Sequence, residues 1–269
     1  LKDLHKPSQA EHSYHEALKL NPKSAWVYSC LAHVEQKLGK HIEARQTAER
    51  AVEIEPENAE YRLTNLNIQL PLRPDTEEEG MYCVERFDEK LEEIKTWTSN
   101  KRRLSALGAR VGYSQPYFLA YRDGNHVERL RRYGTLMSAA SEERWKPTHT
   151  FRHTVTERKI KIGIMSGFIF RHSVWDVVAK GIVCNLDKNK FEITIYHAGA
   201  QIDEQTVIAK QYSGRFVQGP NTHEKWVEII TSDAQDVLFY PEIGMDPYSM
   251  HMASLRLAPL QITSWGHPM

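Results

Sequence analysis

The stretch Lys159–Gly167, which reads KIKIGIMSG, begins the part of the chain that decides the fold class. Its β-branched residues, followed by Ser and Gly, predict a buried strand. Four more strand-like runs follow it, with helical stretches between them. The strands are expected at 160–166, 191–197, 215–218, 236–240 and 261–265, and the helices at 173–186, 204–212, 223–232 and 247–257. Strands that alternate with helices predict parallel βαβ units. Because five strands are too few for an eight-stranded barrel, we predict an open, Rossmann-like parallel sheet over residues 158–269.

The first part of the chain repeats itself at an interval of 34 residues. Pro22 and Pro56 are separated by this interval, as are Ala17 and Ala51. The period and the small residues resemble the tetratricopeptide repeat, in which two antiparallel helices pack closely. We expect one whole repeat from residue 25 to 56, the second helix of a preceding repeat, and a capping helix over 59–70. Glu35 departs from the pattern, since the repeat usually has an aromatic residue or Leu there.

A helical connector is expected between the repeats and the sheet. Two prolines within residues 71–75 end the repeats, because proline cannot continue a helix. Helices are predicted over 76–107 and 127–141. The aromatic segment 116–121 between them is interpreted as a core patch rather than a binding surface. The fold class is therefore α plus α/β, with helical repeats at 1–70, a connector at 71–157 and the sheet at 158–269.

The composition excludes several function classes. Lys plus Arg equals Asp plus Glu at 35 each, so no basic excess points to nucleic acid. The three cysteines are widely spaced without a CxxC motif, which favours a reducing, cytoplasmic location over a disulfide framework or a zinc site. Apolar runs are too short for a membrane span. The chain starts with Leu1, so an upstream segment is expected.

The residues that could bind a ligand follow the predicted strands. For a strand order of 3-2-1-4-5, the order reverses between the first and fourth strands, and ligands bind at the carboxyl ends there. The loops 167–173, 241–246 and 266–268 would meet at this crevice. They contain no GxGxxG or P-loop motif and no His, Cys or Asp cluster with metal-ligand spacing, so we predict neither a dinucleotide nor a metal on this sheet.

His172 is the candidate catalytic residue. It follows the first strand and opens a helix, where a neutral imidazole can hydrogen-bond a hydroxyl group. Its alternative role is to cap the helix. No role is expected for His197, His223 or His251. The candidate substrate-binding residues are Glu242, Gly244, Gly266, His267 and Pro268. For Glu242 the alternative is a partner of a helix N-cap, and for the glycines it is a backbone conformation.

Several longer motifs stand out: Phe170–Trp175, Tyr196–Gly199, Tyr240–Asp246, Leu255–Gln261 and Trp265–Pro268, with Tyr117–Tyr121 and Arg132–Gly134 in the connector. Together they resemble one family, the bacterial tetratricopeptide-containing O-linked N-acetylglucosamine transferases and SPINDLY proteins. The resemblance implies a GT-B fold of two Rossmann-like lobes. It also implies inverting, metal-independent transfer of a sugar from a nucleotide diphosphate sugar to Ser or Thr of a protein. His172 and the loop Gly266-His267-Pro268 correspond to family residues on the acceptor and sugar side.

The resemblance leads to an expected function. The chain is the front half of a protein O-glycosyltransferase, with UDP-GlcNAc as co-substrate, no further cofactor, and an acceptor protein held by the repeats. The donor-binding lobe is expected beyond Met269, so the 269 residues alone should be inactive. Two alternatives stay open: an adhesin-type N-glucosyltransferase that acts on Asn, and a non-catalytic interaction module built on the repeats.

Overall fold

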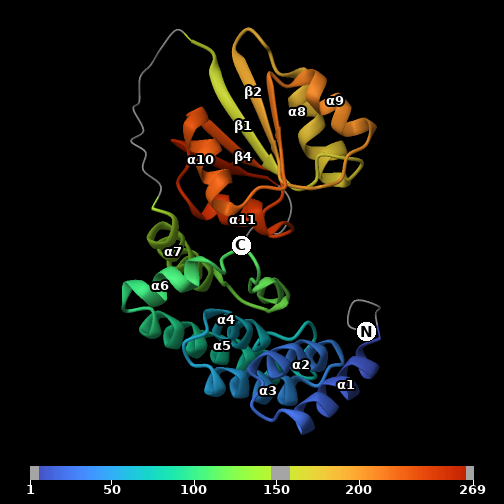
Figure 1. The fold of residues 1–269 in the computed structure, drawn as a ribbon, viewed down its shortest axis with the longest axis vertical. Helices are drawn as coiled ribbons and strands as arrows, with labels where there is room; N and C mark the ends of the chain where they lie inside the picture. Colours follow the sequence, from blue (N-terminus) through green and yellow to red (C-terminus); the bar gives the residue numbers. More distant parts are fainter. Residues whose placement is uncertain (1–5, 147–157, 265–269) are drawn as a thin grey trace. The chain divides into compact units, whose positions relative to one another are not determined.

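The computed structural model describes residues 6–146 and 158–264. Figure 1 shows their helices and strands. The chain divides into two compact units. One contains Leu1–Arg110 and Ser114–Leu136, and the other contains Val111–Tyr113 and Met137–Met269. Each unit has its own core.

The helical unit begins with the predicted repeat. Its first helices are α1 (Pro7–Leu20), α2 (Ala25–Lys37), α3 (His41–Ile54) and α4 (Ala59–Ile68). Side chains of Ser24 and Asn58 accept hydrogen bonds from the first turns of α2 and α4, which is what N-caps do. The fully buried alanines Ala32, Ala44 and Ala48 let α2 and α3 approach closely. The repeat expected at 25–56 is therefore confirmed.

Within its described residues 71–146, the connector has one α-helix more than expected. Its elements are α5 (Glu77–Trp97), α6 (Lys101–Gly108), the short 3₁₀ helix η1 (Tyr117–Tyr121) and α7 (Val127–Trp145). The single helix predicted over 76–107 is wrong, because it breaks at residues 98–100. The Thr98 hydroxyl bonds back to the Ile94 carbonyl, and the Asn100 side chain caps the new helix by accepting from the Arg103 amide. Such side chains compete with the backbone for hydrogen bonds.

The aromatic segment around η1 is a core patch only in part. Leu119 is fully buried, whereas the Tyr121 side chain is 55% exposed. The Tyr117 and Tyr121 hydroxyls lie 3.0 Å apart and their rings meet edge to face. The interpretation as a core patch therefore fails for these tyrosines, which are partly or largely exposed on the helical unit.

The second unit is a parallel sheet with the order β3-β2-β1-β4-β5. Its strands are β1 (Ile160–Ser166), β2 (Phe191–His197), β3 (Arg215–Gln218), β4 (Val237–Tyr240) and β5 (Leu260–Thr263). Every neighbouring pair is parallel. The predicted open sheet is confirmed, and the strand bounds agree closely with those read from the sequence. The order reverses between β1 and β4, as assumed for the crevice.

Helices cover both faces of this sheet (Figure 1). They are η2 (Val174–Ala179), α8 (Lys180–Asn185), α9 (Glu204–Tyr212), α10 (His223–Asp233) and α11 (Pro247–Ser254). Ile164 packs with η2, α8 and α9 on one face, and its neighbour Met165 packs with α10 and α11 on the other. This alternation follows from the two-residue period of a strand. The helix expected at 173–186 differs in detail, because it starts with a π-helical turn.

In residues 6–146 and 158–264, no helix has the length and apolar character that crossing a membrane would need.

The close approach of α2 and α3 is testable by Ala48→Leu. The added methylenes have no space, because Ala48 is fully buried between the helices. We expect the free energy of unfolding to fall by about 1–3 kcal/mol, measured by urea denaturation. Gln46→Leu places the same side chain on the exposed surface of α3, and it should change the free energy of unfolding little. Equal effects of the two variants would contradict the packing.

Candidate functional site

The candidate site lies at the carboxyl ends of β1 and β4, where the strand order reverses. In an open parallel sheet this is where ligands bind. The loop after β1 runs through Gly167 to His172, and the loop after β4 runs through Glu242 to Asp246. Both loops lead into helices, η2 and α11, so backbone N–H groups are directed at this edge.

Glu242 is the buried centre of this edge. Its side chain is fully buried. The Oε1 atom accepts a hydrogen bond of 2.8 Å from the Gly167 amide and lies 3.2 Å from the Ser249 hydroxyl oxygen. The carboxyl thus joins the end of β1 to the end of β4 and to α11. The Oε2 atom is buried and has no hydrogen-bond partner within the described residues. Burial raises the pKa of Glu242 to about 8.

Asp246 stabilises the start of α11. Its Oδ2 atom accepts hydrogen bonds of 2.7 Å from the Ser249 amide and 2.9 Å from the Ser249 hydroxyl, as an N-cap does. Its carboxyl also packs on Gly167, where an added Cβ would lie 3.0 Å from the Asp246 Cγ atom. Gly244, in the same loop, has a φ of 90°, a conformation that favours glycine. Glycine at 244 therefore has a structural reason beside any contact with a ligand.

Gly199 brings a third loop, the one after β2, against the loop after β1. A Cβ atom on Gly199 would overlap the Gly167 carbonyl oxygen and would lie 2.7 Å from the His197 Cε1 atom. His197 is fully buried, and its ring nitrogens Nδ1 and Nε2 lie 3.3 Å and 2.9 Å from the carbonyl oxygens of Ser166 and Gln201, so a neutral ring can donate a hydrogen bond to one of them. It therefore holds the two loops in place. Neither residue was expected to contribute to the site. A glycine two residues after the end of a strand was the signal that could have identified Gly199.

His172 is half-buried in the loop that leads into η2. Its Nδ1 atom lies 3.2 Å from the Val174 amide, and its ring stacks on Phe168 with the ring centres 4.5 Å apart. A backbone amide can only donate, so Nδ1 is the acceptor and a neutral ring carries its proton on Nε2. The structure hence makes His172 a hydrogen-bond donor at Nε2. The following π-turn is a feature often found at functional sites.

The loop that carries His172 is anchored to the start of α9. The Arg171 amide donates a hydrogen bond of 2.8 Å to Asp203, which is the N-cap of α9. The Arg171 guanidinium also forms an ion pair with Glu204.

Of the residues proposed from the sequence, His172, Glu242 and Gly244 lie on two adjacent loops. Gly266, His267 and Pro268 lie outside the described residues.

His223 and His251 form a separate aromatic cluster in the sheet unit. Their ring centres are 4.4 Å apart, and Trp145 and Tyr248 stack against them. His251 is fully buried and neither of its ring nitrogens has a hydrogen-bond partner within the described part of the chain. Burial lowers its pKa to about 3. The cluster packs α10 against α11.

A cleft of about 760 Å³ lies in the helical unit rather than at the sheet edge. The start of α5 and residues 121–129 line it. The charged side chains of Arg122 and Arg129 in its wall are engaged by the Pro71 and Leu72 carbonyls and by Asp88. Arg129 thus forms an ion pair with Asp88, whereas Arg122 is held only by neutral backbone carbonyls.

The loop packing predicts opposite effects for two Gly→Ala substitutions. Gly199→Ala should lower the free energy of unfolding by about 1–3 kcal/mol, because the methyl group overlaps backbone atoms. Gly181→Ala is the matched control. Gly181 lies in α8 with open space around its Cα, so alanine should raise the free energy of unfolding by about 0.5–1 kcal/mol. Chemical denaturation of both variants measures the difference, and a tolerated Gly199→Ala would disprove the contact.

Burial of Glu242 predicts a dependence of stability on pH. Its pKa rises from 4.5 to about 8 on folding, so between these values the folded state holds a proton that the unfolded state has lost. The contribution to stability is complete below pH 4.5 and is lost as the pH rises toward 8. Glu242→Gln should therefore gain stability relative to the wild type as the pH rises, measured by urea denaturation. Glu192→Gln, at an exposed position of β2, serves as the control. A difference that stayed constant with pH would contradict the buried acid.

Comparison with known proteins supports the fold. Residues 14–46 match the tetratricopeptide repeat family. Among solved structures, the chain is similar to a mutant O-GlcNAc transferase from Thermobaculum terrenum, with a TM-score of 0.53 and 20% identity. The similarity covers 96% of this chain and 47% of that one, so the chain spans about half the length of that structure. At this identity the likeness shows the fold alone. Curated protein sequences provide no match.

Proposed function

We propose that the chain forms the acceptor-side part of a nucleotide-sugar-dependent protein O-glycosyltransferase of the O-GlcNAc transferase/SPINDLY type. The observation that supports this most directly lies at the edge between β1 and β4, where the strand order reverses. There His172, a hydrogen-bond donor through Nε2, and the buried Glu242 lie on adjacent loops. Helical repeats on the same chain and a fold similar to that of an O-GlcNAc transferase agree with it.

The reaction would be a single displacement. The acceptor hydroxyl oxygen forms a bond to the anomeric carbon, the bond from that carbon to the diphosphate oxygen breaks, and its electron pair leaves with the diphosphate. The hydroxyl proton passes to a base. We propose a nucleotide sugar, UDP-GlcNAc, as co-substrate, with no metal or further cofactor.

His172 would bind the reacting groups rather than remove the proton. Its Nδ1 lone pair is occupied by the Val174 amide, so Nε2–H is the group that it offers to a sugar or acceptor oxygen. Stacking on Phe168 fixes the plane of the ring. A donor held in this way stabilises charge without reorganising during the reaction.

The other candidate residues would shape the crevice. Glu242 acts as a positioning residue, because its buried carboxyl holds the Gly167 amide and fixes the path of the loop toward His172. Gly244 would allow the loop after β4 to approach a ligand closely. Gly266, His267 and Pro268 are proposed to contact the sugar or acceptor.

The helical repeats would bind the acceptor protein, as repeats of this type commonly bind partner proteins. The proposed compartment is the cytoplasm. A departing diphosphate needs cationic groups or a helix N-terminus, which a GT-B enzyme places on its second lobe. The described residues contain one parallel sheet. We therefore propose that these 269 residues alone do not transfer sugar.

Mass spectrometry can test the proposed function and its alternatives. The full-length protein is incubated with candidate acceptors and UDP-GlcNAc, UDP-glucose or GDP-fucose. Sugar on Ser or Thr is the expected product. Sugar on Asn would instead support an N-glucosyltransferase. Capture of a partner without transfer from any donor would support an interaction module. Transfer by the 269-residue chain alone would contradict the need for a second lobe.

The role of His172 predicts a graded loss of activity. In the full-length protein, His172→Ala removes the Nε2–H donor and should lower kcat for sugar transfer by about 10²–10³-fold, the effect of losing one hydrogen-bond donor to a transition state. His172→Gln should retain part of the activity, because its amide can donate from a similar position. Both variants should keep the melting temperature of the wild type within a few degrees, since His172 is half-buried. Equal losses in Ala and Gln variants would contradict donation through Nε2.

A further inference from the structure

Glu35 is an ionisable residue in the core of the repeat. Its side chain lies on α2 and is 4% exposed, at the position where the repeat usually has an aromatic residue or Leu. The Oε2 atom is buried and lacks a hydrogen-bond partner in the described part of the chain. Burial is the main influence on Glu35 and raises its pKa. A hydrogen bond with the Thr47 side chain and the nearby His15 lower this pKa in part, whereas the negative charges of Glu11 and Glu43 raise it. A buried carboxyl oxygen without a partner costs folding free energy.

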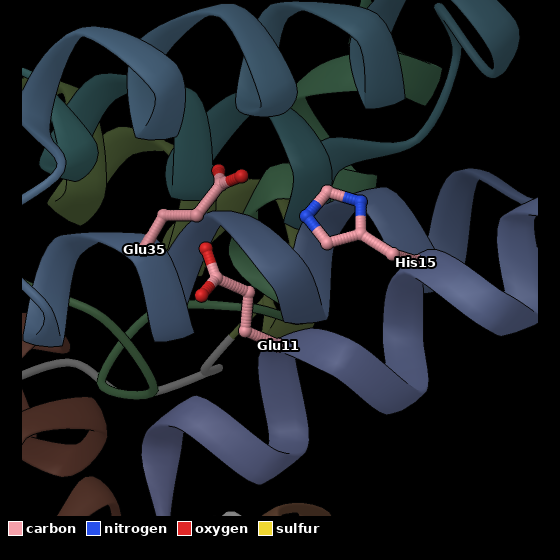
Figure 2. A group of neighbouring side chains, drawn as sticks. All are labelled: Glu11, His15 and Glu35. Atoms are coloured by element: carbon pink, nitrogen blue, oxygen red, sulfur yellow. The ribbon is translucent and has the colours of Figure 1, made fainter.

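Two further ligand-type side chains converge on Glu35 from the neighbouring helix. Glu11 and His15 are four residues apart on α1, so they lie on the same face of that helix. One ligand atom each from Glu11, His15 and Glu35 lies within 4.8 Å of the others. Figure 2 shows the three side chains directed at a common space between α1 and α2.

Among the described residues, one ion pair joins a cation, Lys40, to this group. The Lys40 Nζ atom lies 2.6 Å from the Glu11 Oε1 atom. The Lys40 side chain is 46% exposed and that of Glu11 is 14% exposed. One ammonium faces two carboxyl groups, Glu11 and Glu35, with Glu43 near enough to raise the pKa of Glu35 as well. A divalent cation between Glu11 and Glu35 would supply the charge and the partner that Oε2 lacks.

We propose that Glu11, His15 and Glu35 bind a divalent transition metal of the zinc class, which links α1 to α2. One imidazole nitrogen and two carboxylate oxygens form a ligand set that Zn²⁺ accepts, whereas Ca²⁺ and Mg²⁺ favour oxygen ligands alone. Two ligand atoms on a tetrahedral Zn²⁺ lie about 3.4 Å apart, given bond lengths of about 2.0–2.2 Å. The side chains therefore need only small rotations from their 4.8 Å limit, and water completes the coordination.

Metal binding at this place would stabilise the first helix of the chain's repeat region. The ligands come from two helices, so the metal binds the folded arrangement and not the unfolded chain. Ligands that bind only the folded state raise the melting temperature. The site is separate in sequence and in unit from the candidate site on the sheet, so the proposal does not depend on the glycosyltransferase function.

The test uses the untagged chain, stripped with a chelator and dialysed. It is titrated with ZnCl₂ in a calorimeter, and its metal content is measured after gel filtration. We expect one equivalent of Zn²⁺ per chain and a higher melting temperature with Zn²⁺. MgCl₂ and CaCl₂ at the same concentration should leave the melting temperature unchanged. No saturable Zn²⁺ binding, or equal binding of Mg²⁺, would overturn the proposal.

Three variants assign the binding to these residues. His15→Ala should weaken Zn²⁺ binding at least tenfold, since even the loss of a residue that only orients a ligand costs about 10–100-fold. His12→Ala removes an exposed histidine of the same helix and should leave the affinity unchanged. Glu35→Gln removes the buried charge while keeping the shape, so it should fold and yet bind Zn²⁺ weakly. Wild-type affinity in Glu35→Gln, or equal losses in His12→Ala and His15→Ala, would overturn the assignment.

Discussion

The candidate site depends on one buried contact, the hydrogen bond from the Gly167 amide to the Glu242 carboxyl. Parallel strands end at the same edge, and the loops that follow them must diverge without leaving polar groups unpaired. Glu242 pairs the Gly167 amide and so joins the ends of β1 and β4. The absence of side chains at Gly167 and Gly199 then allows Asp246 and the loop after β2 to pack against the same point. The path of the chain toward His172 follows from this packing.

Much of the fold could be predicted because its signals are local. The β-branched run at 160–166 and the period of 34 residues specify strands and paired helices within short windows of sequence. The connector was harder, because Thr98 and Asn100 end and restart a helix through side-chain hydrogen bonds that the apolar pattern does not reveal. The exposure of Tyr121 depends on which surfaces other helices cover, and that information is also non-local.

The candidate site could be located from the sequence but not resolved into roles. Strand ends point to the loops that carry His172 and Glu242. The tautomer of His172 depends on the Val174 amide, and the burial of Glu242 depends on Ser249 and on packing by α11. The group of Glu11, His15 and Glu35 could likewise not be predicted from the sequence alone. Its ligands come from two helices, so no single motif brings them together, although the departure of Glu35 from the repeat pattern marks the place.

The π-turn at Val174–Ala179 has a consequence for comparing this chain with others. The Lys180 amide bonds the carbonyl of Trp175, five residues earlier rather than four. A turn of this kind holds one residue more than an α-helical turn. Deleting one residue there would restore an ordinary helix, and each residue in an α-helix turns the chain by about 100°. In alignments with related sequences we therefore expect a one-residue gap between His172 and α8. An alignment without that gap would match the residues on one side of the π-turn to positions that are one residue out of register.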